Sequence, residues 1–431
     1  MSTRHAVKQI ALGMFALVIA GRLLHAQSTP PGTPPGTPPA TPPATPSPTT
    51  SGDPILVPLA ADELEALRPL AARGAAILVR DPDSGARARV TVLVRARAPM
   101  SVMHRVISTP EQYTTFMPTI TSVDILSRAN RRVAFRFHVG AIVFDVSSLS
   151  ALHEVSDRRV DVSIVQSEIG PGASRWDLIP DGDGTLVALS TWGDPSRGNW
   201  LLRQVAQRSP SAIAAMNIST DVLLALASTR RAEILAGLRL PQRPVARAAP
   251  PGPLVPPPPG AWLDLARRST IGVVSLNADG AITQCTVAGG TGATVATVLD
   301  RLDDVPHYPD IWRAIREIQP RPAVGAVRGF RMVVQTSLVR NEGDVDRETI
   351  RGAGTGTVWW RGRSGHFVGH EHRWDVQTAP GGGSVVMLTG GSESNRTSWI
   401  TRAMLDRDSW LLPGFAASWK LIWLRPLLAL P

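Results

Sequence analysis

The chain has 431 residues, of which 43% are hydrophobic and 19% charged, with a formal net charge of +10 and one cysteine. This length exceeds a single ordinary core, so two domains are expected, and the composition excludes a largely disordered protein. A lone cysteine excludes intrachain disulfides and cysteine-based metal sites. The only lysines are Lys8 and Lys420. This arginine bias is typical of a GC-rich genome, and otherwise indicates a surface that tolerates lipid headgroups or other anions.

The N-terminus has the pattern of a secretory signal. Arg4 and Lys8 precede an apolar run over residues 10–20, which is shorter than the roughly 20 residues of a membrane span. We expect cleavage after Ala26, so residues 1–26 are predicted to be a signal peptide. The protein is then periplasmic or secreted, and an uncleaved N-terminal membrane anchor is the alternative.

Two proline-rich segments divide the rest of the chain. Residues 27–52 repeat Thr-Pro-Pro and a small residue, so they are predicted to form an extended, semi-rigid linker. Residues 241–260, PQRPVARAAPPGPLVPPPPG, form a second linker. The predicted domains are therefore residues 53–240 and 261–431.

The two blocks repeat one another. RWDLIPDGDGTLVALS begins at Arg175 and RWDVQTAPGGGSVVMLT begins at Arg373. The chain's two tyrosines, Tyr113 and Tyr308, fall on one repeat position, and RGNWLLRQVAQR matches RTSWITRAMLDR. Matched segments in the same order indicate an internal duplication.

Each block is predicted to mix strands and helices. Residues 87–99 alternate apolar and polar side chains, as a half-buried strand does, and residues 100–108 favour a short helix. Three more alternating runs follow, then a hairpin closed by the turn PDGDG. Residues 209–235 have apolar residues at helical spacing and contain proline only at position 210. The order is strand, short helix, antiparallel strands and long helix.

This order, with STPEQYTTFMPTITSVDIL after the short helix and RWDLIPDGDGTLVAL in the hairpin, resembles the START-like (SRPBCC) superfamily. The likeness is greatest to its polyketide cyclase/dehydrase and coenzyme-Q-binding branch. It covers most of residues 86–237 and is weaker in the second block. The resemblance implies an α+β fold of two tandem helix-grip domains. Each is a curved antiparallel sheet wrapped around a long C-terminal helix, with an apolar cavity between them. Such motifs specify fold better than chemistry.

The resemblance also implies ligand contacts, by placing the loop that contains the tyrosine of each domain near the cavity mouth; ordinary core and rim positions are the alternative. The tryptophan of each RWD motif is expected to face inward, with its Arg and Asp on the opposite, solvated face as possible cross-strand ion pairs. Arg203 and Arg402 pack at the start of the closing helix or meet a ligand carboxylate or phosphate. The candidate ligand-binding residues are Tyr113, Phe116, Met117, Trp176, Arg203, Tyr308, Ile311, Trp312, Trp374 and Arg402.

The segment HFVGHEHRW brings three histidines and Glu371 together. In a strand, His370 and His372 share one face and can begin a metal site. No third ligand has the right spacing, so surface histidines are the favoured interpretation, and metal or acid–base chemistry is the alternative. GGTGAT, residues 289–294, lacks the lysine of a phosphate-binding loop. No catalytic residue, metal or cofactor is predicted.

The last segment, SWLLPGFAASWKLIWLRPLLALP, contains three tryptophans. We expect it to be the buried helix of the second domain, interrupted at Pro413 and Pro426, which puts a closed cavity in that domain in doubt. The alternative is an interfacial segment whose tryptophans lie at the depth of membrane headgroups.

The sequence therefore predicts an exported binding or carrier protein for a lipid, quinone or other hydrophobic small molecule. Peripheral contact with anionic membranes is expected, and export argues against nucleic acid. The alternatives are a cyclase or dehydratase for an aromatic or polyketide-like substrate, or an envelope protein that docks through its Trp-rich C-terminus. Ligand identity, the number of binding domains and the oligomeric state stay open.

Overall fold

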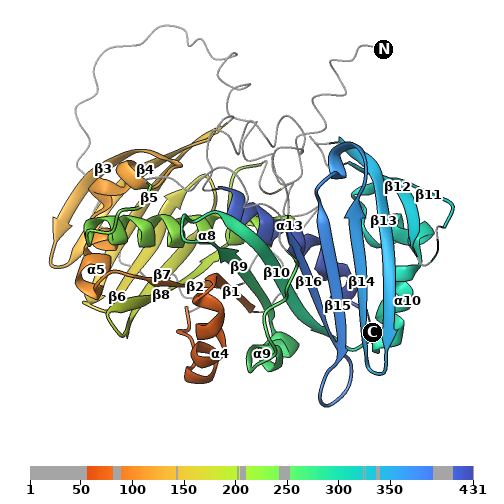
Figure 1. The fold of residues 1–431 in the computed structure, drawn as a ribbon. Coiled ribbons are helices and arrows are strands. Elements are labelled where there is room, and N and C mark those ends of the chain that lie inside the picture. The colour runs from red at the N-terminus through yellow and green to blue at the C-terminus, as the bar shows by residue number, and fades with distance from the viewer. Residues whose placement is uncertain are drawn as a thin grey trace, which may run out of the picture.

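The two halves of the chain form one continuous antiparallel sheet (Figure 1). Within the described residues, this sheet has 16 strands in the order β11-β12-β13-β14-β15-β16-β10-β9-β1-β2-β8-β7-β6-β5-β4-β3. The computed structural model describes residues 56–80, 89–141, 144–200, 203, 210–241, 253–323, 325, 327–335, 340–391 and 411–430.

The two halves have the same succession of elements. The first contains α4 (Ala61–Ala71), β1 (Gly74–Arg80), β2 (Arg89–Ala96), α5 (Met100–Ser108), α6 (Tyr113–Phe116), β3 (Ile120–Ala129), β4 (Arg132–Ala141), β5 (Phe144–Ser156), β6 (Arg159–Ser167), β7 (Gly172–Asp181), β8 (Gly184–Gly193) and α8 (Pro210–Leu235). The second contains α9 (Trp262–Arg268), β9 (Thr270–Leu276), β10 (Ile282–Thr291), α10 (Val295–Asp303), α11 (Tyr308–Ile311), β11 (Ile315–Pro320), β12 (Arg328–Gln335), β13 (Arg340–Gly352), β14 (Thr355–Gly362), β15 (Glu371–Thr378), β16 (Ser384–Gly391) and α13 (Leu411–Leu428).

In each half a long helix lies across the sheet. Helix α8 packs on β2 and β8, and α13 packs on their counterparts β10 and β16. The strand order is also the same in both halves. The predicted fold class, two tandem helix-grip domains, is therefore confirmed. Helix α4 and strand β1 precede the first strand that alternation predicted, and α9 and β9 repeat them in the second domain. The linker boundaries stay predictions, because residues 242–252 lie outside the described ranges.

Both tyrosines make the same contact. Each hydroxyl donates a hydrogen bond to the backbone carbonyl six residues earlier in the chain. Each ring also meets a phenylalanine edge-on, Tyr113 with Phe135 at 6.2 Å between ring centres and Tyr308 with Phe330 at 5.9 Å. The repeat position inferred from the sequence is thus an equivalent position in space.

The domains join through equivalent elements. Strand β1 pairs with β9 antiparallel, which makes the two sheets continuous. On the inner side α8 packs against α13, and the hydroxyl oxygens of Ser219 and Ser418 are 2.7 Å apart. A Cβ added at Gly414 would lie 2.6 Å from the Ser219 carbonyl oxygen, so small residues allow the close approach of the helices. Contacts between equivalent positions indicate an approximate two-fold axis between the domains, as in a symmetric dimer.

Helix α13 corrects one expectation. It runs without interruption from Leu411 to Leu428. Pro413 lies in its first turn, where a backbone N–H has no intrahelical acceptor, and only the last turn follows Pro426. Leu412, Trp423 and Leu424 are buried, so the prediction of a buried gripping helix is confirmed. No helix among the described residues has the length and apolar character to cross a membrane.

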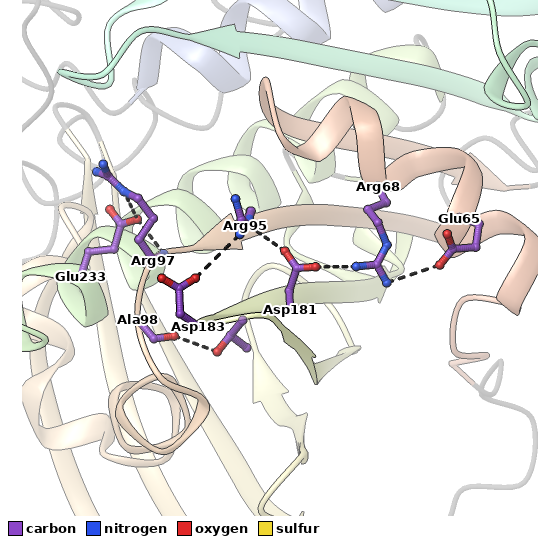
Figure 2. A network of polar contacts seen from close by, with 9 residues as sticks. Glu65, Arg68, Arg95, Arg97, Ala98, Asp181, Asp183 and Glu233 are labelled. Atoms are coloured by element: carbon purple, nitrogen blue, oxygen red, sulfur yellow. Dashed lines mark hydrogen bonds and ion pairs between the residues drawn. The ribbon is translucent and has the colours of Figure 1, made fainter.

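Polar contacts fix the helices to the ends of the first domain's strands (Figure 2). Asp181, beside the predicted hairpin turn, pairs with Arg68 of α4 and with Arg95 of β2, the latter at 2.6 Å. Glu233 of α8 accepts a hydrogen bond of 2.9 Å from the backbone N–H of Arg97. The Asp181 pairs attach α4 to the sheet, and the Glu233 bond attaches the end of α8 to the residue after β2.

Candidate functional site

The inner face of the first domain lies between α8 and the strands on which it packs. Directly paired residues of neighbouring strands point to the same face of a sheet, so the register identifies the side chains that face inward. Many of them are buried or half-buried and apolar, with several hydroxyl groups among them. On β4 to β8 they include Phe135, Phe137, Ser148, Ser150, Leu152, Val160, Val162, Ile164, Ser174, Trp176, Leu178, Val187, Leu189 and Thr191.

The second domain fills the corresponding interior with indole rings. The ring centres of Trp312, Trp360 and Trp423 lie 5.1–5.9 Å from one another. The indole N–H of Trp312 donates a hydrogen bond of 2.8 Å to the Trp423 carbonyl oxygen. All three side chains are at most 7% exposed, and Tyr308 and Trp374 pack on them. These rings bridge the helix and the sheet.

Smaller side chains occupy the same three positions in the first domain. Val162 pairs with the residue two before the RWD tryptophan of the first domain, and Trp360 pairs with the residue two before that of the second, so Val162 and Trp360 are equivalent. The backbone N–H of Met117 donates to the Tyr113 carbonyl oxygen just as that of Trp312 donates to the Tyr308 carbonyl oxygen, so Met117 and Trp312 are equivalent. The contact between Ser219 and Ser418 aligns the two long helices and makes Leu224 equivalent to Trp423. Val162 and Leu224 are half-buried, whereas their indole counterparts are buried. Solvent therefore reaches the inner face in the first domain at positions that the second domain fills.

The predicted ligand contacts of the first domain lie beside these positions. Tyr113, Met117 and Trp176 are buried, at 4–7% exposure. Phe116 is half-buried and meets Tyr113 edge-on at 5.9 Å. Burial raises the pKa of the Tyr113 hydroxyl, and its bond to a backbone carbonyl gives that hydroxyl a structural role. The other half-buried apolar side chains on this core include Ile120, Val123, Ile125, Phe137, Val162 and Leu224.

Sequence reasoning missed Asp221, the acidic group of this interior. It lies on α8, is 4% exposed, and accepts a hydrogen bond from the Thr191 hydroxyl of β8. Burial raises its pKa to about 8, against the lowering effect of that bond. At neutral pH the carboxyl is therefore mostly protonated and can donate a hydrogen bond. The signal in the sequence is an aspartate within the apolar stretch ISTDVLLALA.

Hydroxyl groups continue from Asp221 across the inner face. Ser174 pairs in register with Thr191. Ser150 is 1% exposed, and its Oγ has no hydrogen-bond partner among the described residues. Ser148 and Ser167 bond to each other at 2.5 Å. A few polar groups on an apolar wall can fix the orientation of an apolar ligand that carries oxygen.

The RWD motifs are arranged largely as predicted. Both tryptophans face inward, and the Arg and Asp lie on the opposite face. Arg175 pairs across strands with Asp161 at 3.3 Å, and Arg373 pairs with Asp375 of its own strand at 2.8 Å. The prediction of a solvated face is wrong, because Arg175 and Asp375 are only 9% and 8% exposed. These groups hold the sheet and lie away from the interior.

The remaining predicted contacts stay predictions. Arg203 is exposed, and its guanidinium donates a hydrogen bond of 3.1 Å to the Gly198 carbonyl oxygen. Arg402 lies outside the described residues. In the second domain Tyr308, Trp312 and Trp374 belong to the buried aromatic cluster, and Ile311 is half-buried against it.

The histidine cluster differs from the favoured interpretation. His370 and His372 are half-buried, and burial lowers the pKa of both imidazoles. The description as surface histidines is therefore wrong. Within the described ranges, no group of three or more His, Cys, Asp or Glu residues is placed to hold a metal ion.

Comparison with known proteins found no matching family model and no matching curated protein. Solved structures do match. The di-domain ARO/CYC StfQ from the steffimycin biosynthetic pathway is 13% identical, with 77% of this chain and 96% of that chain covered and a TM-score of 0.25. A START superfamily protein from Mycobacterium smegmatis is 21% identical over 34% of this chain and 98% of its own, with a TM-score of 0.28. A STAR-related lipid transfer protein from Xanthomonas axonopodis is 15% identical over 37% of this chain and 93% of its own, with a TM-score of 0.27.

These structures belong to the group that the sequence resembles. The assignment of the fold rests on this chain itself, on the strand order that its two halves share and on the single long helix across each sheet. This is the fold that the START-like resemblance implies.

Proposed function

We propose that this chain is a binding or carrier protein for a hydrophobic small molecule, such as a lipid or quinone, held in the first domain between α8 and the inner face of the sheet. One observation carries the proposal. Val162 and Leu224 are half-buried where the second domain has buried indoles. An interior with apolar walls and few polar groups favours apolar ligands. The second domain then supports the first through the shared sheet and the helix pair.

A fluorescent apolar probe tests this proposal. Purified protein, extracted with organic solvent, is titrated with uncharged N-phenyl-1-naphthylamine. We expect saturable binding to the wild type and its loss in Val162→Trp, which places the second domain's indole in the first. Leu126→Trp is the matched control, because Leu126 is an exposed side chain on β3, 51% accessible. Equal binding by all three proteins, or none by the wild type, contradicts the proposal.

Asp221 favours an enzyme as the second candidate. A buried carboxyl with a raised pKa can act as a general acid toward a carbonyl or hydroxyl of a bound aromatic or polyketide-like substrate. A ligand recovered from the protein and returned to it should then be chemically changed, and Asp221→Asn should leave it unchanged. Recovery of the ligand unaltered from the wild type excludes this candidate.

Export and membrane contact are further parts of the proposal. The basic and apolar pattern of residues 1–26 supports secretion, and the net charge of +10 favours anionic surfaces. N-terminal sequencing of protein from the periplasm or medium should begin at Gln27. Protein found only in the cytoplasm with residues 1–26 intact contradicts export. Docking through the Trp-rich end has less support, because Trp423 and Leu424 face the interior.

A further inference from the structure

The second domain has a group of buried nitrogen atoms around the position that is equivalent to Asp221 of the first domain. Ser219 of α8 and Ser418 of α13 are equivalent residues that contact each other. Two residues further along each helix, Asp221 of α8 is therefore equivalent to Lys420 of α13. Lys420 is 2% exposed. It is one of only two lysines in the chain, the other being Lys8. The first domain thus has a carboxyl group, and the second domain an amine, at one equivalent position.

The sheet beneath Lys420 brings polar side chains into one row. His372 of β15 and Cys285 of β10 both pair in register with Gly390 of β16. A Cβ added at Gly390 would lie 2.5 Å from Nδ1 of His372 and 3.0 Å from Cε of Lys420. The missing side chain therefore lets the lysine and the imidazole meet over the strand.

This row is rich in nitrogen groups that can donate hydrogen bonds and poor in acceptors. Among the described residues, no partner bonds to Nδ1 of His372 or to Nε2 of His370, and both atoms are buried. Within the part of the chain that the structure describes, no carboxylate pairs with Lys420. Buried donors without partners cost free energy, which an acceptor group would recover.

The surroundings limit the kind of acceptor. Trp360 pairs in register with His372, and Trp423 lies one turn after Lys420 on α13. Such apolar walls oppose a doubly charged phosphate more strongly than a single negative charge. His370, His372 and Trp419 are half-buried, so solvent reaches this edge of the cluster. The acceptor that these surroundings favour is therefore a single negative charge on an otherwise apolar molecule.

We infer that the second domain binds the carboxylate of an apolar organic acid, with Lys420, His372 and His370 as its hydrogen-bond donors. Burial lowers the pKa of Lys420 in the absence of a counter-ion. The bound carboxylate supplies the opposite charge, which raises the pKa of Lys420 and stabilises its ammonium form. The two domains then differ in ligand class, since the first offers a neutral acid and the second offers bases.

Lysine labelling gives a direct test on the full chain. Protein with Val162→Trp, which blocks the site proposed for the first domain, is labelled with 13C at lysine Cε, so that at most two signals appear. We expect dodecanoate to shift the Lys420 signal saturably and methyl dodecanoate to leave it in place. No shift with either compound, or the same shift with both, overturns the inference.

A variant series gives the second test. In the same background, Lys420→Met should weaken dodecanoate binding by about ten- to hundredfold, the effect of losing a hydrogen bond to a charged group. Arg331→Met is the matched control, because it removes an exposed cation from β12 of the same domain. Circular dichroism checks the fold of each variant. An unchanged dissociation constant in Lys420→Met also overturns the inference.

Discussion

Replacing Asp221 by asparagine should remove a pH dependence from the stability of the protein. The pKa of this carboxyl is about 8 in the folded protein, against a reference value of 3.8. Between these values the native state keeps a proton that the unfolded state has lost. Stability therefore falls as pH rises, by about 1.4 kcal/mol for each pH unit. Asparagine keeps an acceptor for Thr191 and does not titrate, so this slope disappears.

Urea unfolding at pH 5, 6 and 7, followed by circular dichroism, measures the effect. The free energy of unfolding of Asp221→Asn minus that of the wild type should grow by about 3 kcal/mol from pH 5 to pH 7. Groups common to both proteins cancel in this difference. Asp183→Asn is the control, because the Asp183 side chain is fully exposed, and its difference should stay constant. A constant difference for Asp221→Asn as well refutes the account of a buried, protonated carboxyl.

Three further substitutions test the packing. Trp360→Val should cost about 3 kcal/mol of unfolding free energy, since it empties the centre of the indole cluster; a neutral result in urea unfolding contradicts that packing. Tyr113→Phe and Tyr308→Phe should each cost about 1 kcal/mol, because each removes one buried hydrogen bond, and clearly unequal costs contradict the equivalence of the two positions. Gly414→Val should lower the melting temperature, because its Cβ would meet the Ser219 backbone, and an unchanged melting temperature contradicts the close helix contact.

Local features of the sequence predicted several elements of the first domain. Alternation of apolar residues predicted the strands, PDGDG predicted the turn between β7 and β8, and helical spacing predicted α8. The RWD tryptophans face inward because a large apolar ring gains most from burial. The repeated tyrosine predicted an equivalence that its hydrogen bond confirms.

Features that depend on distant contacts could not be predicted in this way. The pairing of β1 with β9 joins segments about two hundred residues apart, and no local pattern indicates which strand edges meet. The interpretation of His370 and His372 as surface residues failed because α13 brings Lys420 close to both imidazoles. The importance of Asp221 is apparent only once α8 is placed over Thr191.

The central claim is that the first domain holds a neutral apolar ligand between α8 and the sheet, at the positions that the second domain fills with indole rings. Native mass spectrometry of the purified wild-type chain, before and after extraction with organic solvent, tests it most directly when Val162→Trp is measured beside it. We predict an added mass on the wild type that extraction removes and that is absent from Val162→Trp. The same added mass on both proteins would contradict the assignment to the first domain.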